Sequence, residues 1–297
     1  EKPDALRSGF TDVSQQSGRH RIVVVGAGFG GLEVVAGLKG SGADITIVDR
    51  RNHHLFQPLL YQVAGASLSP SDIAWPVRSL FRKRKDVRTL LGEVHDVDTE
   101  RRRVLVGGGA EIDYDTLIIA TGARHSYFGH DQWEPFAPGL KSLEDATTIR
   151  RRVLKAFEDA ELEKDPARRA ALQTFVIIGG GPTGVELAGT IAEIAHITLK
   201  RDFRAIDPDT SRVILIEAGQ RLLPVFPETL SSYTQQALEK LGVDVILGKA
   251  ATECSSSGVE VDGEEIPAAT ILGRLVCRHL PQRDGSIPKL IAPGEFW

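Results

Sequence analysis

Two glycine-rich segments have the residue types and the spacing of a turn that binds the pyrophosphate of a dinucleotide. One reads IVVVGAGFGGLE (22–33) and the other FVIIGGGPTGVE (175–186). In each, an apolar β-branched run precedes Gly-x-Gly-x-x-Gly and a helical pattern follows, which is the context that this fingerprint requires. One copy would be weak, because glycine-rich turns also form for purely conformational reasons. Two copies in register favour binding: Gly26, Gly28 and Gly31 recur 153 residues later as Gly179, Gly181 and Gly184.

Each glycine of the fingerprint has its own task. The first allows a tight turn, the second lets backbone approach the pyrophosphate, and the third lets the helix pack closely against the strand. The free N–H groups and the dipole of the helix N-terminus then favour a phosphate there. The residues expected to bind phosphate are Gly26, Gly28, Gly30 and Gly31 in the first turn, and Gly179, Gly181, Pro182, Thr183 and Gly184 in the second.

An acidic residue ends the next apolar run after each turn. ITIVDR places Asp49 18 residues past Gly31, and RVILIEAG places Glu217 33 residues past Gly184. An acid at this point of a dinucleotide-binding unit binds ribose hydroxyls, and it would repel a 2′-phosphate. The second site should therefore prefer NADH to NADPH. The alternative is that either acid is only a solvated residue at the end of a strand.

Several further elements must support these turns. The strand pattern YDTLIIATGA (114–123) would bring Thr121 and Gly122 close to a bound nucleotide. Ser142 and Asp145 have the spacing of a capping box. They open an amphipathic helical pattern that should link two nucleotide domains, with Leu143, Ala146, Ile149, Val153 and Phe157 on one side.

Composition narrows the class of protein. The chain has 297 residues, of which 41% are apolar and 26% charged, and its net charge is −4. These values suit about two globular domains and argue against a general nucleic-acid binder. Apolar runs are strand-sized, and the first twenty residues lack the apolar core of a signal peptide, so a cytosol-facing protein is expected. Two cysteines, Cys254 and Cys277, form neither a disulfide framework nor a close redox pair. The chain contains no Met, which indicates a processed chain or a piece of a longer one.

Long segments resemble the type II NADH dehydrogenases, single-subunit NADH:quinone oxidoreductases that do not pump protons. The matching segments are DRRNHHLFQPLLYQVA (49–64), LSPSDIAWPVRS (68–79), TGARHSYFGHDQWEPFAPGLKSLEDA (121–146) and GGGPTGVELAG (179–189). These belong to the flavoproteins with two dinucleotide-binding domains. The resemblance implies an α/β fold with two Rossmann-like domains of the pyridine nucleotide-disulfide oxidoreductase type, the first for FAD and the second for NADH.

The resemblance also assigns residues to tasks. It implies that the first turn binds the FAD pyrophosphate, Asp49 the FAD ribose, Arg50 the adenine side and Thr121-Gly122 the FAD-side strand end. It implies that the second turn and Glu217 bind NADH, and that the catalytic residue is Glu186, an acid beside the nicotinamide and flavin. As a residue of the first helical turn, Glu186 should also be stabilised by the helix dipole. The alternative is that Glu186 is only an N-terminal helix acid, since its twin Glu33 shows that such an acid can occupy this place without a chemical role.

Three other features have modest interpretations. His53 and His54 are adjacent, so their side chains should point apart, and no metal site is expected. The basic run of Arg78, residues 82–85 and Arg88 is interpreted as a solvated helix face rather than a lipid-binding patch. Tyr61-Gln62 resembles a stretch that approaches the flavin and quinone region in the family.

The resemblance stops near residue 271. The second Ala-Gly turn, the Gly-Asp strand end, the Ala-Gln quinone motif and the amphipathic C-terminal helices of the family are missing, so the FAD domain is expected to be incomplete at its C-terminus. Residues 273–297 have no periodicity, and we interpret them as an altered reading frame or vector-derived sequence. The expected organisation is a polar tail (1–20), the first part of an FAD domain (21–135), an NADH domain with its linking helix (136–270) and an aberrant tail (271–297).

The expected activity of the full-length parent is hydride transfer from NADH to FAD and then electron transfer to a quinone. The parent is expected on the cytoplasmic side of the inner or plasma membrane, attached through the missing segment, and a homodimer is possible; the chain as given is expected to be soluble. Two alternatives remain: a flavoprotein reductase of a ferredoxin-like carrier, and a non-catalytic nucleotide-binding remnant. For this chain we expect weak or absent FAD retention, detectable NADH binding at best, and no quinone reduction.

Overall fold

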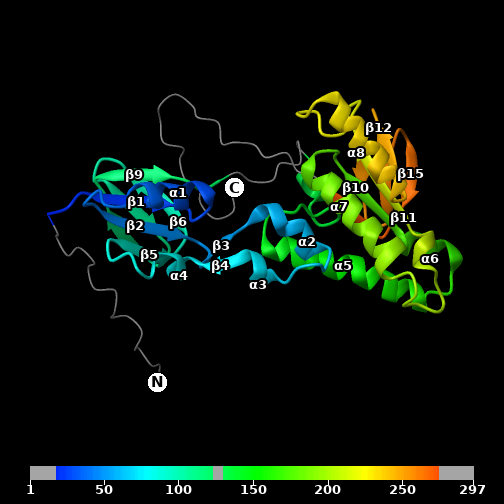
Figure 1. Ribbon diagram of the computed structural model, residues 1–297, viewed down its shortest axis with the longest axis horizontal. Helices are drawn as coiled ribbons and strands as arrows, with labels where there is room; N and C mark the ends of the chain where they lie inside the picture. The colour runs from blue at the N-terminus through cyan, green and yellow to red at the C-terminus, as the bar shows by residue number, and fades with distance from the viewer. Residues whose placement is uncertain (1–17, 123–129, 274–297) are drawn as a thin grey trace, which may run out of the picture. The chain divides into compact units, whose positions relative to one another are not determined.

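A computed structural model of the protein describes residues 18–122 and 130–273. Within these ranges the chain forms two compact units, one of residues 18–55 and 74–122 and one of residues 56–73 and 130–273 (Figure 1). Each contains a parallel Rossmann-like sheet, which confirms the predicted α/β fold class. No helix in the described part of the chain has the length and apolar character needed to cross a membrane. The predicted aberrant tail beyond residue 273 and most of the predicted polar tail lie outside the described residues.

The first unit is organised around a four-stranded parallel sheet with the order β5-β2-β1-β9. Its strands are β1 (Arg21–Val25), β2 (Asp44–Asp49), β5 (Val87–Leu91) and β9 (Thr116–Ile119). One face is covered by α1 (Phe29–Gly37) and α4 (Val77–Phe81), where Val35 and Val77 pack against Ile22, Val24 and Ile45. Both faces of β1 are buried, which explains why its sequence is a continuous β-branched run rather than an alternating one.

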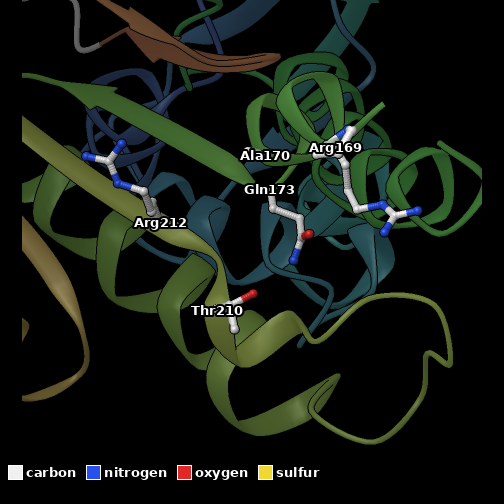
Figure 2. A pocket seen from close by; sticks show the side chains of 6 residues that line it. Arg169, Ala170, Gln173, Thr210 and Arg212 are labelled. Carbon is white, nitrogen blue, oxygen red and sulfur yellow. The ribbon is translucent and has the colours of Figure 1, made fainter. Parts of the chain in front are cut away.

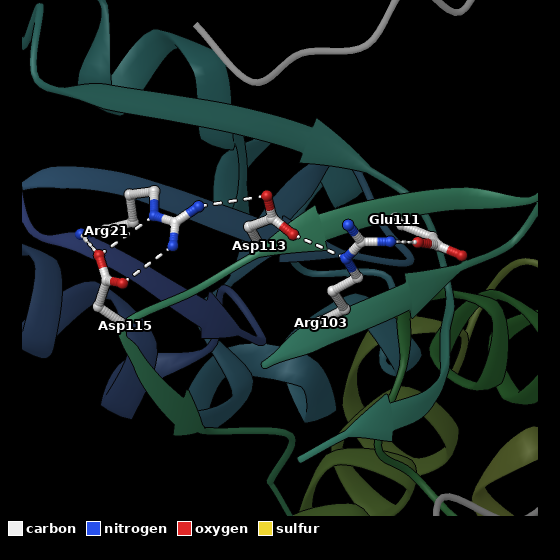
Figure 3. A network of polar contacts seen from close by, with 5 residues as sticks. All are labelled: Arg21, Arg103, Glu111, Asp113 and Asp115. Atoms are coloured by element: carbon white, nitrogen blue, oxygen red, sulfur yellow. Dashed lines mark hydrogen bonds and ion pairs between the residues drawn. The ribbon is translucent and has the colours of Figure 1, made fainter. Parts of the chain in front are cut away.

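An antiparallel sheet covers the other face of the first unit. It consists of β6 (Val94–Asp98), β7 (Arg103–Val106) and β8 (Ala110–Asp113), and its Val104 and Val106 pack against Val23 and Val25. Ion pairs join the two sheets at the start of β1 (Figure 3). Arg21 of β1 binds Asp115 at 2.9 Å and Asp113 at 3.2 Å, and Asp113 also binds Arg103 at 2.9 Å. A separate two-stranded ladder pairs β3 (His53–Leu55) with β4 (Ala74–Pro76).

The second unit repeats this plan. Its parallel sheet has the order β12-β11-β10-β16, from β10 (Thr174–Ile178), β11 (Arg212–Glu217), β12 (Val243–Leu247) and β16 (Thr270–Gly273). An antiparallel sheet of β13 (Ala251–Cys254), β14 (Gly258–Val261) and β15 (Glu264–Pro267) packs on one face through Cys254, Val259 and Val261. Strand for strand, the order matches that of the first unit. The repeat seen in the glycine motifs therefore extends to the whole sheet arrangement.

The helices of the second unit range in length from 4 to 20 residues. They are α2 (Leu60–Ala64), α3 (Pro70–Ile73), α5 (Leu143–Leu162), α6 (Pro166–Leu172), α7 (Pro182–Glu193) and α8 (Glu228–Lys240), with short helical turns at Gln57–Leu59, Asp131–Trp133, Ile194–Thr198 and Pro208–Thr210. The predicted capping box of α5 is confirmed, because Ser142 accepts from the Asp145 N–H and Asp145 accepts from the Ser142 N–H. Ala146, Ile149, Val153 and Phe157 are buried, as the periodicity of this segment predicts.

Two local features differ from expectation or from the repeat. The predicted basic helix face does not form, because α4 ends at Phe81 and Arg84 lies beyond it, bound to Asp86 and to the Val35 carbonyl. The strands β9 and β16 occupy the same place in their sheets, yet Ile118 of β9 is half-buried whereas its counterpart Leu272 of β16 is fully buried. The next residue of β9, Ile119, is 42% exposed. The apolar surface of β9 is therefore covered less well than that of its counterpart.

Candidate functional site

The first glycine-rich turn joins β1 to α1 and is tightly packed. Gly26 has φ +105°, and a Cβ there would lie 2.3 Å from the Ala120 carbonyl oxygen. A Cβ on Gly31 would lie 1.8 Å from the Gly26 carbonyl oxygen, so α1 can approach the turn this closely only with glycine at 31. Gly28, the N-cap of α1, is exposed, and a Cβ there would meet no atom of the described residues within 4 Å. The helix N-terminus thus faces open space.

The second turn joins β10 to α7 with the same conformation. Gly179 also has φ +105°, and a Cβ on Gly184 would lie 1.9 Å from the Gly179 carbonyl oxygen. Gly181 is the N-cap of α7, and Pro182 and Thr183 are its first two helical residues. Proline suits this place because its missing N–H is one that the helix leaves unpaired.

Each predicted ribose acid holds the turn of its own unit. Asp49 Oδ2 accepts from the Ala27 N–H at 2.6 Å and Oδ1 from the Arg51 N–H at 2.7 Å. Glu217 Oε2 accepts from the Gly180 N–H, and Oε1 from the Gly219 N–H at 2.7 Å. Ala27 and Gly180 are equivalent residues, since each follows the first glycine of its motif. The repeat therefore includes the contact between acid and turn.

These hydrogen bonds leave acceptor capacity for a ligand. A carboxylate has about four lone-pair sites, and each acid uses two of them on backbone N–H groups. The remaining sites can accept from two vicinal hydroxyl groups. Asp49 and Glu217 are both partly exposed, so a diol can reach them. A phosphate there would meet like charge instead.

Other predicted residues lie around the first turn. Thr121 and Gly122 are exposed, follow β9 directly, and adjoin Ala120, whose N–H binds the Val25 carbonyl at 2.8 Å. Gly122 has φ +77°, a conformation that glycine adopts without strain. Arg50 and Gly30 are also exposed. A Cβ on Gly30 would lie 3.9 Å from the Ala120 side chain. Gly30 at the start of the helix and Thr121, which follows Ala120, therefore both adjoin the turn.

The expectation for Glu186 needs a correction. Helix α7 begins at Pro182, its first turn contains no acid, and Glu186 lies in the second turn, beyond the direct reach of the N-terminal N–H groups. Burial raises the pKa of the Glu186 carboxyl. This is the opposite of the expected stabilisation of its charge by the helix dipole. The helix α2 packs against α7 near this point, where a Cβ on Gly65 would lie 1.9 Å from Thr190 Cγ2. Thr190 is one helical turn after Glu186 and so shares its face.

The twin acid Glu33 has a different environment. It occupies the equivalent place in α1, but it is exposed whereas Glu186 is half-buried. The sequence repeat by itself predicts equal surroundings for the two acids. It does not include α2, so it could not reveal the difference. Only Glu186 lies in partly desolvated surroundings, where a carboxyl can hold a proton at a higher pH than usual.

Sequence reasoning missed two groups that touch the turns. The imidazole of His54 contacts the Ala27 carbonyl, with Nδ1 at 3.0 Å from the oxygen, and the N–H of Leu223 donates to the Gly180 carbonyl at 2.8 Å. His54 is in β3 and Leu223 follows β11 by a loop, so no fixed motif spacing announces either one. For His54, the sequence offered its place five residues after Asp49 as a signal.

One cavity of about 210 Å³ has two arginines in its lining but no convergent site (Figure 2). The guanidinium groups of Arg169 and Arg212 point away from each other, while Gln173 and Thr210 lie between them. Arg169 binds the Glu163 carbonyl, and Arg212 lies 3.8 Å from Asp244. The cavity is also at the start of β11, whereas the glycine turns follow strand ends. It therefore offers no anion site. Among the described residues, His, Cys, Asp and Glu form no group of three or more that could hold a metal ion.

Comparison with known proteins shows the family of the chain. The pyridine nucleotide-disulphide oxidoreductase family matches residues 20–273, and the chain belongs to this family. More specifically, it is a homologue of the type II NADH:quinone oxidoreductases. It is 47% identical over 251 residues to the enzyme Ndh of Mycobacterium tuberculosis and 46% identical over 266 residues to NdhA of the same organism. These matches cover 84% and 88% of the chain, which confirms the family resemblance.

The match covers only part of the length of these relatives. The chain spans about half the length of these relatives, 54% of Ndh and 56% of NdhA. Solved structures show the same fold. NDH2 of Plasmodium falciparum in complex with NADH superposes with a TM-score of 0.82 at 22% identity, over 88% of this chain and 56% of that one. The sulfide:quinone oxidoreductase of Aquifex aeolicus gives a TM-score of 0.71 at 19% identity, over 87% and 59%.

Proposed function

We propose that this chain carries the nucleotide-binding part of an NADH:quinone oxidoreductase, with FAD at the first turn and NADH at the second. The observation that supports this most is the double repeat of glycine turn and bracing acid, one in each unit. FAD, when bound, supplies the two-electron chemistry that accepts hydride from NADH and passes electrons to a quinone. The residues of the chain bind the two nucleotides and orient them.

For FAD, the first turn meets the steric and polar requirements. The open space at Gly28 admits a pyrophosphate to the N-terminus of α1, and Asp49 keeps acceptor sites for ribose hydroxyls. Gly26, Gly30 and Gly31 shape this turn, Thr121 and Gly122 complete it from the end of β9, and Arg50 adds positive charge beside Asp49. These residues fit the group, and we assign them to it.

For NADH, the second turn offers Gly179, Gly181 and Gly184, with Pro182 and Thr183 at the start of α7. Glu217 selects against NADPH, since its carboxylate would face the 2′-phosphate. The experiment compares NADH and NADPH binding by fluorescence titration in the unaltered chain and in Glu217→Gln. Glutamine keeps an acceptor for the Gly180 N–H but removes the charge. Preference for NADH should fall, and equal binding of both nucleotides by the unaltered chain would refute the assignment.

Glu186 is the proposed catalytic residue. Its raised pKa, caused by burial, suits a group that holds or moves a proton near the nicotinamide. In the full-length protein, Glu186→Gln should slow turnover and leave bound flavin intact. The helix α2, whose Tyr61 accepts from Gln62 Nε2 at 3.0 Å, packs against α7 and is proposed to border the quinone region. Peripheral membrane attachment, the cytoplasmic location and a homodimer are proposals for the full-length protein alone.

A second candidate is a nucleotide-binding remnant without catalysis. The exposure of Ile119 on β9 favours it, because the strand that leads to Thr121 and Gly122 is less well packed than β16. We accordingly expect FAD to be held weakly by this chain and quinone reduction to be absent. Absorption spectra distinguish the two functions. A purified protein that is yellow, keeps stoichiometric FAD through gel filtration and is bleached by NADH is an enzyme, whereas a colourless one that binds NADH is the remnant.

A further inference from the structure

In each of the two turns, one residue is held through both its backbone N–H and its backbone carbonyl. In the first turn the N–H of Ala27 donates to Asp49 and the carbonyl of Ala27 contacts His54 Nδ1. In the second turn the N–H of Gly180 donates to Glu217 and the carbonyl of Gly180 accepts from the N–H of Leu223. The second contact comes from a side chain in one unit and from backbone in the other. Two unlike donors thus hold equivalent carbonyls.

The imidazole of His54 is well placed for a fixed contact. It is only 6% exposed, and the ring of Phe29, the first residue of α1, stands edge-on to it with centroids 5.0 Å apart and planes at 88°. A carbonyl oxygen can only accept a hydrogen bond, so Nδ1 must carry the proton. The bond is therefore made by one neutral tautomer or by the charged imidazolium, and the other neutral tautomer cannot make it.

Planarity of the peptide group transmits this contact to the next residue. The Ala27 carbonyl and the Gly28 N–H belong to one trans peptide unit, in which they point in opposite directions. Holding the carbonyl on His54 therefore aims the Gly28 N–H away from His54. Gly28 is the exposed N-cap of α1, and within the described part of the chain a Cβ there would meet nothing within 4 Å.

We propose that His54 is a positioning residue that aims the Gly28 N–H at the phosphate-binding space of the first turn. It acts through the Ala27 peptide and does not touch the nucleotide. The inference rests on the proposed function for the identity of the nucleotide, but not for the geometry of the turn. Because Leu223 provides the equivalent bond from backbone, only the first turn depends on a side chain for this contact.

The chain offers a matched control next to His54. His53 lies in the same strand, is half-buried and contacts Asn52 rather than the turn, with Nδ1 3.3 Å from Oδ1. His53→Asn therefore makes the same change of residue type without removing a contact to Ala27. His54→Asn retains a donor near the place of Nδ1, whereas His54→Leu removes it. The rescue by asparagine separates a hydrogen-bonding role from simple packing.

The first readout is the tautomer of His54 in the unaltered chain, measured by nitrogen NMR of the protein labelled with ¹⁵N-histidine. The His54 signals are assigned as those missing from the spectrum of His54→Asn. We expect the proton on Nδ1. A His54 that carries its proton on Nε2 alone would overturn the inference, whether or not any variant folds.

The second readout is amide hydrogen exchange at the two turns. His54→Leu should speed exchange of the Ala27 amide by roughly fivefold, the factor that corresponds to one neutral hydrogen bond. His54→Asn should restore most of the protection, His53→Asn should not change it, and the Gly180 amide should be unaffected throughout. Unchanged exchange at Ala27 in a folded His54→Leu protein, or no rescue by asparagine, would overturn the inference.

Titration with FAD forms a separate arm. His54→Leu should weaken FAD binding by roughly fivefold for the same reason, and His53→Asn should not. Equal FAD affinity in His54→Leu and the unaltered chain would contradict the inference. If the unaltered chain binds no FAD, the proposed FAD site fails for this chain, and the tautomer and exchange results still decide whether His54 positions the turn.

Discussion

Replacing either of two glycines of α7 by alanine should distinguish the effect of steric exclusion on stability from the effect of helix propensity. Gly184 and Gly189 lie on the same helix, five residues apart. A Cβ on Gly184 would lie 1.9 Å from the Gly179 carbonyl oxygen, whereas a Cβ on Gly189 would meet its nearest atom, Leu238 Cδ2, at 3.6 Å. The first distance is impossible without movement of the backbone, and the second is an ordinary van der Waals contact.

The expected effects therefore have opposite signs. In Gly184→Ala, α7 must move away from the turn by more than 1 Å to restore a normal contact, and forced overpacking of this kind costs about 1–3 kcal/mol. In Gly189→Ala, the favourable helix propensity of alanine should stabilise the protein by up to about 1 kcal/mol. In Gly184→Ala the same movement shifts the N-terminus of α7 away from the turn, so the affinity for NADH should also fall.

Urea unfolding followed by circular dichroism gives the free energies, and fluorescence titration gives the NADH affinities. The first unit supplies a replicate. A Cβ on Gly31 would lie 1.8 Å from the Gly26 carbonyl oxygen, whereas a Cβ on Gly37 would meet none of the residues that the structure describes within 4 Å. Equal stability of Gly184→Ala and Gly189→Ala, with equal NADH binding, would refute the assignment of Gly184 as a close-packing glycine.

Three further predictions concern charge and reactivity. The bond to Arg21 holds the pKa of Asp115 far below its ordinary value of 3.8, so this pair stabilises the protein above pH 3.8 and loses its effect as the pH falls. Asp115→Asn should therefore narrow the difference in unfolding free energy between neutral and acidic pH. An unchanged difference would contradict this prediction. Burial raises the pKa of Glu186, which means that its charge opposes folding as the pH rises; Glu186→Gln should raise the urea midpoint at neutral pH and leave it unchanged in acid, where both side chains are neutral. Burial raises the pKa of the Cys254 thiol to about 12. In a Cys277→Ser protein this remaining thiol should react with a disulfide reagent at pH 8 only after unfolding. Rapid reaction of the folded protein would show that the thiol is accessible and would contradict the prediction.

The features that sequence predicted well are those whose causes are local. The strand, turn and helix at each glycine motif follow from adjacent residues, because positive φ at Gly26 and Gly179 requires a residue without a Cβ. The capping box at Ser142 likewise needs only four consecutive residues. The family resemblance rests on longer matches, and the comparisons confirm it.

The features that sequence did not predict depend on distant parts of the chain. The half-burial of Glu186 comes with the packing of α2, which is more than a hundred residues earlier, against α7. The donors to the two turn carbonyls, His54 and Leu223, also reach their partners through tertiary structure. The exposure of β9 relative to β16 could not be read from two equally apolar strands, because burial depends on what packs over them.

The excursion of residues 56–73 has a consequence for how the protein can be divided. The chain leaves the first unit after Leu55, where Leu55 pairs with Ala74, and returns at Ala74. It belongs to the first unit up to residue 122 and to the second unit from residue 130. Within residues 18–273 the two units are thus joined by three covalent connections. A protease that nicks the chain at any one of them leaves both units attached, and release of either requires three cuts. Neither unit corresponds to one uninterrupted stretch of gene, so a clone that ends at residue 122 encodes the first unit together with a piece of the second.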